Sequence, residues 1–135
     1  MKQCRVLIVN CAERQTAHHQ ALERRGFLVA ETREWPDDET IKGYEVVIIV
    51  LRHVDTMCML AARMRAKRWF GHRVLIGLSP SNTTTGDRRE GIAAGFDDIF
   101  GVASNSRLLL ARILQRLHAR PEHRCLLPDR KRSAA

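Results

Sequence analysis

Short apolar runs alternate with stretches that have helical spacing along the first 120 residues of the chain. Runs of four to six consecutive apolar residues are typical of strands that are buried on both faces of a parallel sheet. Five such runs are present, at 6–9, 27–30, 46–51, 74–78 and 99–102. The run at 46–51 is the longest and contains only Val, Ile and Leu. We therefore expect it to be the central strand.

Helices are predicted between and after these runs. The expected segments are 13–25, 36 to just before Gly43, 55–64, Thr85 or Asp87 to about Ala94, and 110–117. Glycines 26 and 95 stand where a helix commonly ends, and Asp55 is the expected N-cap of the third helix. In the last helix Leu110, Ile113, Leu114 and Leu117 recur at helical spacing and predict its buried face.

Five strands alternating with five helices predict an α/β fold with an open, doubly wound parallel sheet. Sites in such sheets form beyond the carboxyl ends of the strands, where the strand order reverses. The positions to inspect are therefore those directly after the strands: 10–12, 50–53, Ser79 and Val102.

The length of 135 residues and the charge distribution indicate one domain and a basic extension. We expect a domain over residues 1–120 and a disordered tail or linker remnant over 121–135. The chain holds 23 Lys and Arg against 15 Asp and Glu, a net charge of +8. A second basic cluster lies at Arg63, Arg65, Lys67, Arg68 and Arg73. A basic balance raises nucleic acid as a candidate partner, although runs of charge usually only solvate a surface.

The sequence gives no sign of a membrane segment, a signal peptide or a disulfide framework. Its longest apolar run is far shorter than the roughly 20 residues that cross a bilayer. Cys4, Cys11, Cys58 and Cys125 are scattered without a Cys-x-x-Cys pair, which fits neither a zinc site nor a disulfide scaffold. We therefore expect reduced thiols and a cytoplasmic protein.

Several stretches resemble the receiver domain of bacterial two-component response regulators. Residues 90–100, Glu-Gly-Ile-Ala-Ala-Gly-Phe-Asp-Asp-Ile-Phe, are close to the Ala-x-x-Ala-Gly-Ala-Asp-Asp-Tyr segment of that family. Residues 106–113 resemble its final helix, particularly in winged-helix transcription regulators, and 5–9 and 44–51 resemble its first strand and phosphorylation strand. The resemblance covers about residues 4–119. It implies a flavodoxin-like fold with strand order 2-1-3-4-5.

The residues that carry the family's chemistry are missing at the matching positions. A working receiver transfers a phosphoryl group to an aspartate, with Mg²⁺ held by an acidic pair and a lysine on the phosphoryl group. By the resemblance, the acidic pair falls on Asn10 and Cys11, or one residue later, and the phosphoacceptor on Val50. The lysine falls on Val102, and only the hydroxyl position survives, as Ser79. We therefore expect a degenerate receiver that is not an enzyme and binds no metal or other cofactor.

Three other residues near this pocket are candidate replacements. Glu13 and Asp55 are the nearest carboxylates in sequence, but each suits the first turn of a helix, where the dipole favours an acid. Cys11 is either a small buried side chain or a redox- or ligand-sensing thiol. A small ligand in the emptied pocket stays open as an alternative function.

The leading functional hypothesis is a signalling adaptor that works through protein contacts. In the family, the fourth helix, fifth strand and fifth helix form the output surface, on which winged-helix relatives pair through acids and an arginine. Asp97, Asp98 and Arg112 stand at those positions, and Ile99 replaces the aromatic switch residue. Leu109 is expected with Arg112 at the edge of the last helix. The expected partner is a histidine kinase, a regulator or a second copy; nucleic acid is a less favoured alternative, and no membrane partner is expected.

Overall fold

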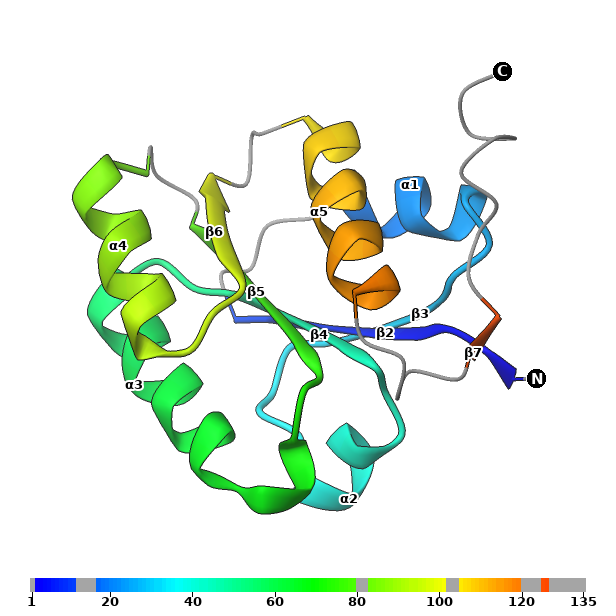
Figure 1. Cartoon of the computed structure of the whole chain (residues 1–135), viewed down its shortest axis with the longest axis horizontal. Helices are drawn as coiled ribbons and strands as arrows, with labels where there is room; N and C mark the ends of the chain where they lie inside the picture. The colour runs from blue at the N-terminus through cyan, green and yellow to red at the C-terminus, as the bar shows by residue number, and fades with distance from the viewer. Residues whose placement is uncertain (1, 12–16, 80–82, 102–104, 120–124, 127–135) are drawn as a thin grey trace.

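A parallel sheet of five strands forms the centre of the computed structural model, which describes residues 2–11, 17–79, 83–101, 105–119 and 125–126 (Figure 1). The strands are β2 (Arg5–Asn10), β3 (Leu28–Thr32), β4 (Val46–Val50), β5 (Val74–Ser79) and β6 (Asp98–Gly101). Their spatial order is β3-β2-β4-β5-β6, and every neighbouring pair is parallel. Counted along the chain within this sheet, the order is 2-1-3-4-5. The predicted α/β fold is confirmed.

Helices cover both faces of the sheet, as Figure 1 shows. They are α1 (His18–Arg24), α2 (Asp38–Lys42), α3 (Val54–Ala66), α4 (Thr85–Ala94) and α5 (Ser106–His118), with a short 3₁₀ helix, η1 (Arg68–Phe70), after α3. Buried residues of α1 and α5 join one core cluster, and those of α2 and α3 join the other. This division follows from the strands, because alternate side chains of a strand point to opposite faces. No helix in the described part of the chain is long and apolar enough to cross a membrane.

Local sequence determines where most of the helices begin. The Asp37 side chain accepts a hydrogen bond from the Thr40 N–H at the start of α2, and Thr84 and Asp87 form a reciprocal capping box at the start of α4. Asp55 does not cap α3 as predicted. The N-cap is His53, which makes no side-chain capping bond, and Asp55 lies in the first turn. The predicted start of the first helix at Glu13 lies outside the described residues.

A second, two-stranded sheet joins the two ends of the chain. β1 (Lys2–Gln3) pairs in parallel with β7 (Cys125–Leu126). The hydrophobic pattern does not predict this pairing, because two residues are too few to show a period. Residues 120–124 and 127–135 lie outside the described part, so the domain boundary at residue 120 stays a prediction.

Ile99 fills the space between β6 and α4, and a glycine on α4 makes room for it. A Cβ atom placed on Gly91 would lie 2.0 Å from Ile99 Cδ1 and 2.6 Å from Ile99 Cγ1. Ile99 is fully buried and cannot withdraw into solvent. The close approach of helix and strand therefore depends on Gly91.

We expect Gly91→Ala to lower the free energy of unfolding by about 1–3 kcal/mol, because overpacking outweighs the gain in helix propensity. Gly86→Ala is the matched control on the same helix. A Cβ atom placed on Gly86 would lie 3.7 Å from its nearest neighbour, Thr84 Oγ1, which is an ordinary van der Waals contact. That variant should be neutral or up to about 1 kcal/mol more stable. Urea denaturation of both variants measures the difference. Equal stability of the two would show that α4 can move away from β6 at little cost.

Candidate functional site

The positions that correspond to the phosphorylation pocket meet at the carboxyl ends of three strands. Asn10 lies opposite Val50, and Val50 lies opposite Leu78. The Cys11 N–H donates to the Val50 carbonyl at 3.0 Å, which holds the two chain segments together beyond the strands. Ser79 ends the next strand, where it pairs with Gly101. Val102, the position of the family's lysine, lies outside the described residues.

The side chains at these positions offer no carboxylate. Val50 is fully buried in the core cluster that β2, β4 and β5 share with α5. Asn10 and Ser79 are also buried. Within the described residues, no group of three or more His, Cys, Asp or Glu side chains could hold a metal ion. Of the two alternative carboxylates, Glu13 lies outside the described residues, and Asp55 is exposed in the first turn of α3.

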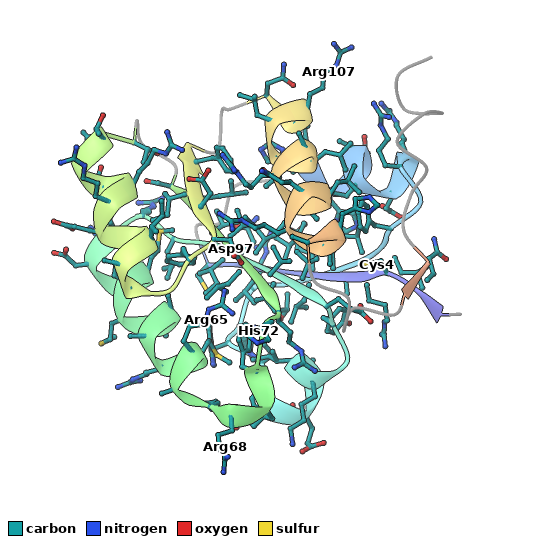
Figure 2. The ribbon with its side chains drawn as sticks, viewed as in Figure 1. Cys4, Arg65, Arg68, His72, Asp97 and Arg107 are labelled. Atoms are coloured by element: carbon teal, nitrogen blue, oxygen red, sulfur yellow. The ribbon has the colours of Figure 1, made fainter. Side chains whose placement is uncertain are left out.

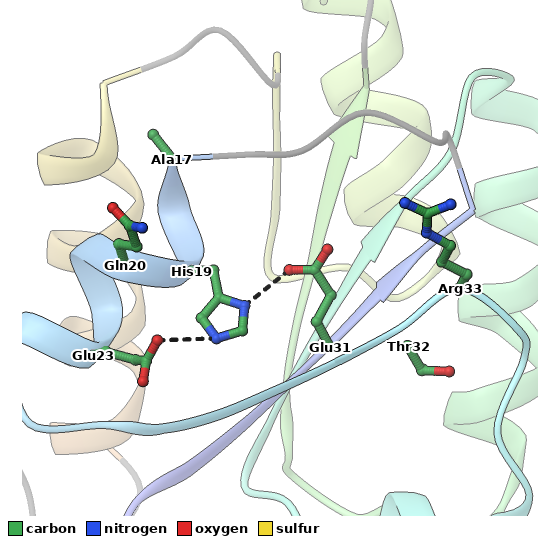
Figure 3. A pocket seen from close by; sticks show the side chains of 7 residues that line it. All are labelled: Ala17, His19, Gln20, Glu23, Glu31, Thr32 and Arg33. Atoms are coloured by element: carbon green, nitrogen blue, oxygen red, sulfur yellow. Dashed lines mark hydrogen bonds and ion pairs between the residues drawn. The ribbon is translucent and has the colours of Figure 1, made fainter.

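A polar network that the sequence did not reveal occupies the β3 side of this edge (Figure 3). Asn10 Nδ2 donates to Glu31 Oε2 at 3.1 Å. The other Glu31 oxygen lies 3.0 Å from His19 Nδ1, and His19 Nε2 lies 3.0 Å from Glu23. His19, Glu23 and Glu31 border an open hollow of about 720 Å³ between α1 and β3. The network ties α1 to the sheet edge.

The adjacent residues His18 and His19 point to different surroundings. His18 is buried, and its Nδ1 lies 2.8 Å from Ser106 Oγ, which joins α1 to the start of α5. His19 is partly exposed and binds the two glutamates instead. The two rings therefore do not share a site.

The environments of Cys11 and Cys58 favour the protonated thiol. Cys11 is exposed and is therefore not the small buried side chain that the sequence suggested. Its Sγ donates to the Arg33 carbonyl at 3.4 Å, and partial desolvation raises the pKa of the thiol. Burial also raises the pKa of the Cys58 thiol, with smaller contributions from nearby carboxylates, first Glu90. Cysteines that sense oxidants have lowered pKa values and a large thiolate fraction. These surroundings argue against the redox-sensing alternative for Cys11.

We expect iodoacetamide to alkylate Cys11 and Cys58 more slowly at pH 7.5 than it alkylates a free cysteine peptide. The thiolate is the reactive form, and a raised pKa moves its appearance to higher pH. The rate should still climb at pH values where the peptide has reached its plateau. Peptide-level mass spectrometry resolves each site. A Cys11 rate above that of the peptide would restore the sensing hypothesis.

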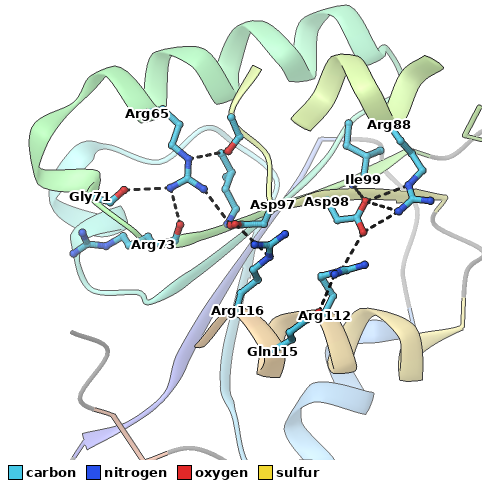
Figure 4. Close-up of polar contacts among 12 residues, drawn as sticks. Arg65, Gly71, Arg73, Arg88, Asp97, Asp98, Ile99, Arg112, Gln115 and Arg116 are labelled. Carbon is cyan, nitrogen blue, oxygen red and sulfur yellow. Dashed lines mark hydrogen bonds and ion pairs between the residues drawn. The ribbon is translucent and has the colours of Figure 1, made fainter. Parts of the chain in front are cut away.

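Asp97 is buried at the start of β6 and paired within the chain (Figure 4). Its Oδ2 atom accepts the Leu75 N–H at 2.8 Å and contacts Arg65 Nη2 at 3.1 Å. Arg116 of α5 approaches the other oxygen, with its Nε 3.8 Å away. The carboxylate thus joins β5, α3 and α5.

Asp98 is paired in the same way with helices on its two sides. Arg88 of α4 contacts it at 3.2 Å, and Arg112 of α5 also contacts it at 3.2 Å. Its Oδ1 atom also accepts the Ile99 N–H. The side chain of Asp98 is only 2% exposed, whereas those of Arg88 and Arg112 are 49% and 32% exposed.

These positions correct the predicted interface. Asp97, Asp98 and Ile99 are buried, so the two acids are satisfied by arginines of the same chain and present little surface to a partner. The prediction that Leu109 lies at the edge of the last helix is wrong, because its side chain is only 1% exposed. It joins Leu110, Ile113, Leu114 and Leu117 in the core, so α5 buries a broader stripe than helical spacing predicted. Arg112 alone keeps a partly exposed side chain.

The exposed part of this region carries apolar and basic side chains. Ile92 follows Arg88 by one helical turn on α4, and Leu108 precedes Arg112 by one turn on α5, so each lies on the same side as its arginine. Ile92 is 52% exposed and Leu108 is 60% exposed. We call the surface formed by Arg88, Ile92, Leu108, Arg112 and Arg116 the α4–β6–α5 face.

Most of the basic cluster at 63–73 supports the fold. Arg65 donates to the carbonyls of Gly95, Gly71 and Arg73, and Lys67 lies 2.6 Å from Asp38. Arg73 donates to four backbone carbonyls, and burial lowers the pKa of its guanidinium. Arg63 and Arg68 are exposed, and Figure 2 shows Arg68 pointing away from the protein. The cluster is therefore a weaker candidate for nucleic acid than its charge suggests.

The fold is that of response regulator receiver domains. An orphan response regulator of H. pylori is 20% identical, with a TM-score of 0.64 over 84% of this chain and 95% of that chain. A response regulator from Thermotoga maritima is 19% identical, with a TM-score of 0.70 over 84% and 97%. An atypical orphan response regulator, described as revealing a phosphorylation-independent regulatory mechanism, is 21% identical, with a TM-score of 0.67 over 84% and 95%. No protein-family model and no curated protein matches the sequence.

Proposed function

We propose that this chain is a signalling module with a receiver fold, which acts without phosphorylation by binding a protein partner with its α4–β6–α5 face. The observation that carries this proposal is the fully buried Val50 at the phosphoacceptor position. Phosphoryl transfer requires a nucleophile and a Mg²⁺ ion, and Mg²⁺ prefers carboxylate oxygens. Val50 supplies no nucleophile at the phosphoacceptor position, and Asn10 and Cys11 supply no carboxylate for the metal ion. The module is therefore not an enzyme and needs no cofactor.

Two of the solved structures support this proposal. One belongs to an orphan response regulator, and another to an atypical orphan regulator with a phosphorylation-independent mechanism. We extend that mode of action to this chain because its own pocket lacks carboxylates. In cells, the module would act in the cytoplasm, where signalling kinases and regulators are found.

The composition of the α4–β6–α5 face supports its role in binding. Leu108 and Ile92 are the most exposed of the large apolar side chains in the described residues. They lie among partly exposed arginines, and arginine is enriched in protein–protein interfaces while apolar groups form their cores. The buried Ile99 leaves this surface with one arrangement, because no aromatic ring can swing between pocket and solvent.

Site-specific photocrosslinking tests the proposal. A photoreactive residue replaces Leu108 in one variant and Leu28 in another. Leu28 is the matched control, since it is 49% exposed and lies on β3, the opposite edge of the sheet. We expect a defined protein to crosslink through position 108 and not through position 28. The yield should be the same with and without acetyl phosphate and Mg²⁺, and intact mass spectrometry should detect no phosphoryl adduct.

Two results would contradict the proposal. A phosphoryl adduct that raises the crosslinking yield would show that another residue has taken over phosphorylation. Crosslinks through position 28 alone would place the interface at the other edge of the sheet.

A further inference from the structure

The charge of the α4–β6–α5 face limits what can bind there. The sequence of α5 contains three arginines and no acidic residue. On α4, the acids are Asp87, which forms the capping box with Thr84, and Glu90, which lies two residues from both Arg88 and Ile92 and therefore on another side of the helix. Asp97 and Asp98 are buried. The exposed charge of the face is therefore positive.

The arginines on this face outnumber the carboxylates that they contact. Asp97 and Asp98 each contact two arginines of the same chain, and their side chains are 6% and 2% exposed. The contacts with Asp98 hold Arg88 and Arg112 in place, whereas Arg116 Nε lies 3.8 Å from Asp97 without a hydrogen bond. Each of the three side chains remains at least 32% exposed. Guanidinium groups held in place with free donors are suited to bind further carboxylates, often through two parallel hydrogen bonds.

A second copy of this chain is a poor occupant for the face. A twofold dimer places the same patch of both subunits in contact. The arginines of one α5 would then face those of the other, without an exposed acid on either helix to separate them. Like charges brought together across an interface cost several kcal/mol. In the family, the corresponding acids pair with an arginine of the other subunit. Asp97 and Asp98 do not offer that contact here, because they are buried and already contact arginines of their own chain.

From these contacts we infer that the α4–β6–α5 face receives an acidic, amphipathic segment of a different protein. Apolar side chains of that segment pack on Ile92 and Leu108, and its carboxylates contact Arg88, Arg112 and Arg116. This inference rests on the proposed function and adds the class of partner and the exclusion of self-association.

Two synthetic helical peptides of equal length test the charge preference directly. One places leucines at positions i, i+3, i+4 and i+7 with glutamates elsewhere, and the other replaces the glutamates with lysines. Fluorescence anisotropy with the full chain should detect binding of the acidic peptide and none of the basic one. Rising salt should weaken the complex, since exposed charges are screened. Sedimentation velocity of the chain alone should show a monomer.

Matched variants locate the binding surface. Arg107→Glu reverses an exposed charge one residue from Leu108, outside the arginines that define the face, so it lowers the positive potential there without breaking a contact with Asp97 or Asp98. An acid in the first turn of α5 also suits the helix dipole. We expect this variant to weaken binding of the acidic peptide by about tenfold. Leu108→Ser should weaken it as well. Arg68→Glu, at the exposed end of η1, is the control and should bind unchanged.

Failure of this inference is distinguishable from failure of the proposed function. Equal binding of both peptides, or a dimer that Arg107→Glu dissociates, would overturn the acidic partner. Photocrosslinks through position 108 to a neutral or basic segment would also overturn it and leave the proposed function intact. If no protein crosslinks specifically through position 108, both the acidic-partner inference and the proposed function are overturned.

Discussion

Replacing Val50 with aspartate is expected to lower the free energy of unfolding by about 3–5 kcal/mol and to restore no phosphorylation. The substitution recreates the family's phosphoacceptor but puts a carboxylate where the side chain is fully buried in the core. Neither Asn10 nor Cys11 supplies a ligand for a compensating metal ion. Thermal and urea denaturation measure the loss of stability, and intact mass spectrometry with acetyl phosphate and Mg²⁺ measures phosphorylation.

The pH dependence of this variant identifies the cause of the loss. A buried carboxyl group without a partner has a pKa above that of the unfolded chain, so the folded state binds the proton more tightly. Its destabilisation relative to the native chain is therefore full at high pH and shrinks as the pH falls through the folded pKa toward the unfolded value. Val50→Thr, which keeps the shape and adds an uncharged hydroxyl, should lose less stability and show no such dependence. An aspartate variant as stable as the native chain would mean that the pocket is already open to water.

The central sheet was predictable because its strands are apolar on both faces. The runs at 46–51 and 74–78 became β4 and β5 almost residue for residue, since no other arrangement buries so many consecutive aliphatic side chains. The pocket followed from the same reasoning, because parallel strands bring their carboxyl ends to one edge. Asn10, Val50 and Ser79 meet at that edge, and predicting this required no knowledge of loop geometry.

The interface residues were harder to predict because their environment comes from distant segments. Aspartates such as Asp97 and Asp98 are usually found at the surface. Here, ion pairs with arginines of α3, α4 and α5 offset the cost of removing their carboxylates from water. Helical spacing assigned Leu110 to the core but not Leu109, since it gives the centre of a buried stripe and not its width. The Asn10–Glu31–His19 network likewise depends on the alignment of β2 with β3 and α1, which no local motif encodes.

These contacts change what a charge reversal at Arg112 would report. On a free surface, Arg112→Glu would test association without affecting stability. Here it would place a second carboxylate against the buried Asp98 and leave Arg88 as the neighbouring cation. A loss of binding in that variant would include a loss of folding. Arg107 is the better position for testing association, because its side chain is exposed and outside the two buried pairs.

Asp97→Ala is expected to destabilise the chain by about 2–4 kcal/mol. It removes the acceptor for the buried Leu75 N–H and the carboxylate that joins Arg65 to Arg116. An unsatisfied buried N–H alone costs about 1–3 kcal/mol. Asp97→Asn keeps an oxygen for Leu75 and loses only the charge, so it should fall between the alanine variant and the native chain.

A half-exposed ion pair provides the control for this prediction. Asp38 lies 2.6 Å from Lys67, with the two side chains 46% and 36% exposed. Because solvent screens such a pair, Asp38→Ala should cost less than about 1 kcal/mol. Urea denaturation of the three variants at pH 7 gives the ranking Asp97→Ala, Asp97→Asn, Asp38→Ala in order of decreasing loss. If Asp97→Ala lost no more than Asp38→Ala, the carboxylate would not hold β6 to α3 and α5, and the rigid placement of the arginines on the α4–β6–α5 face would need another cause.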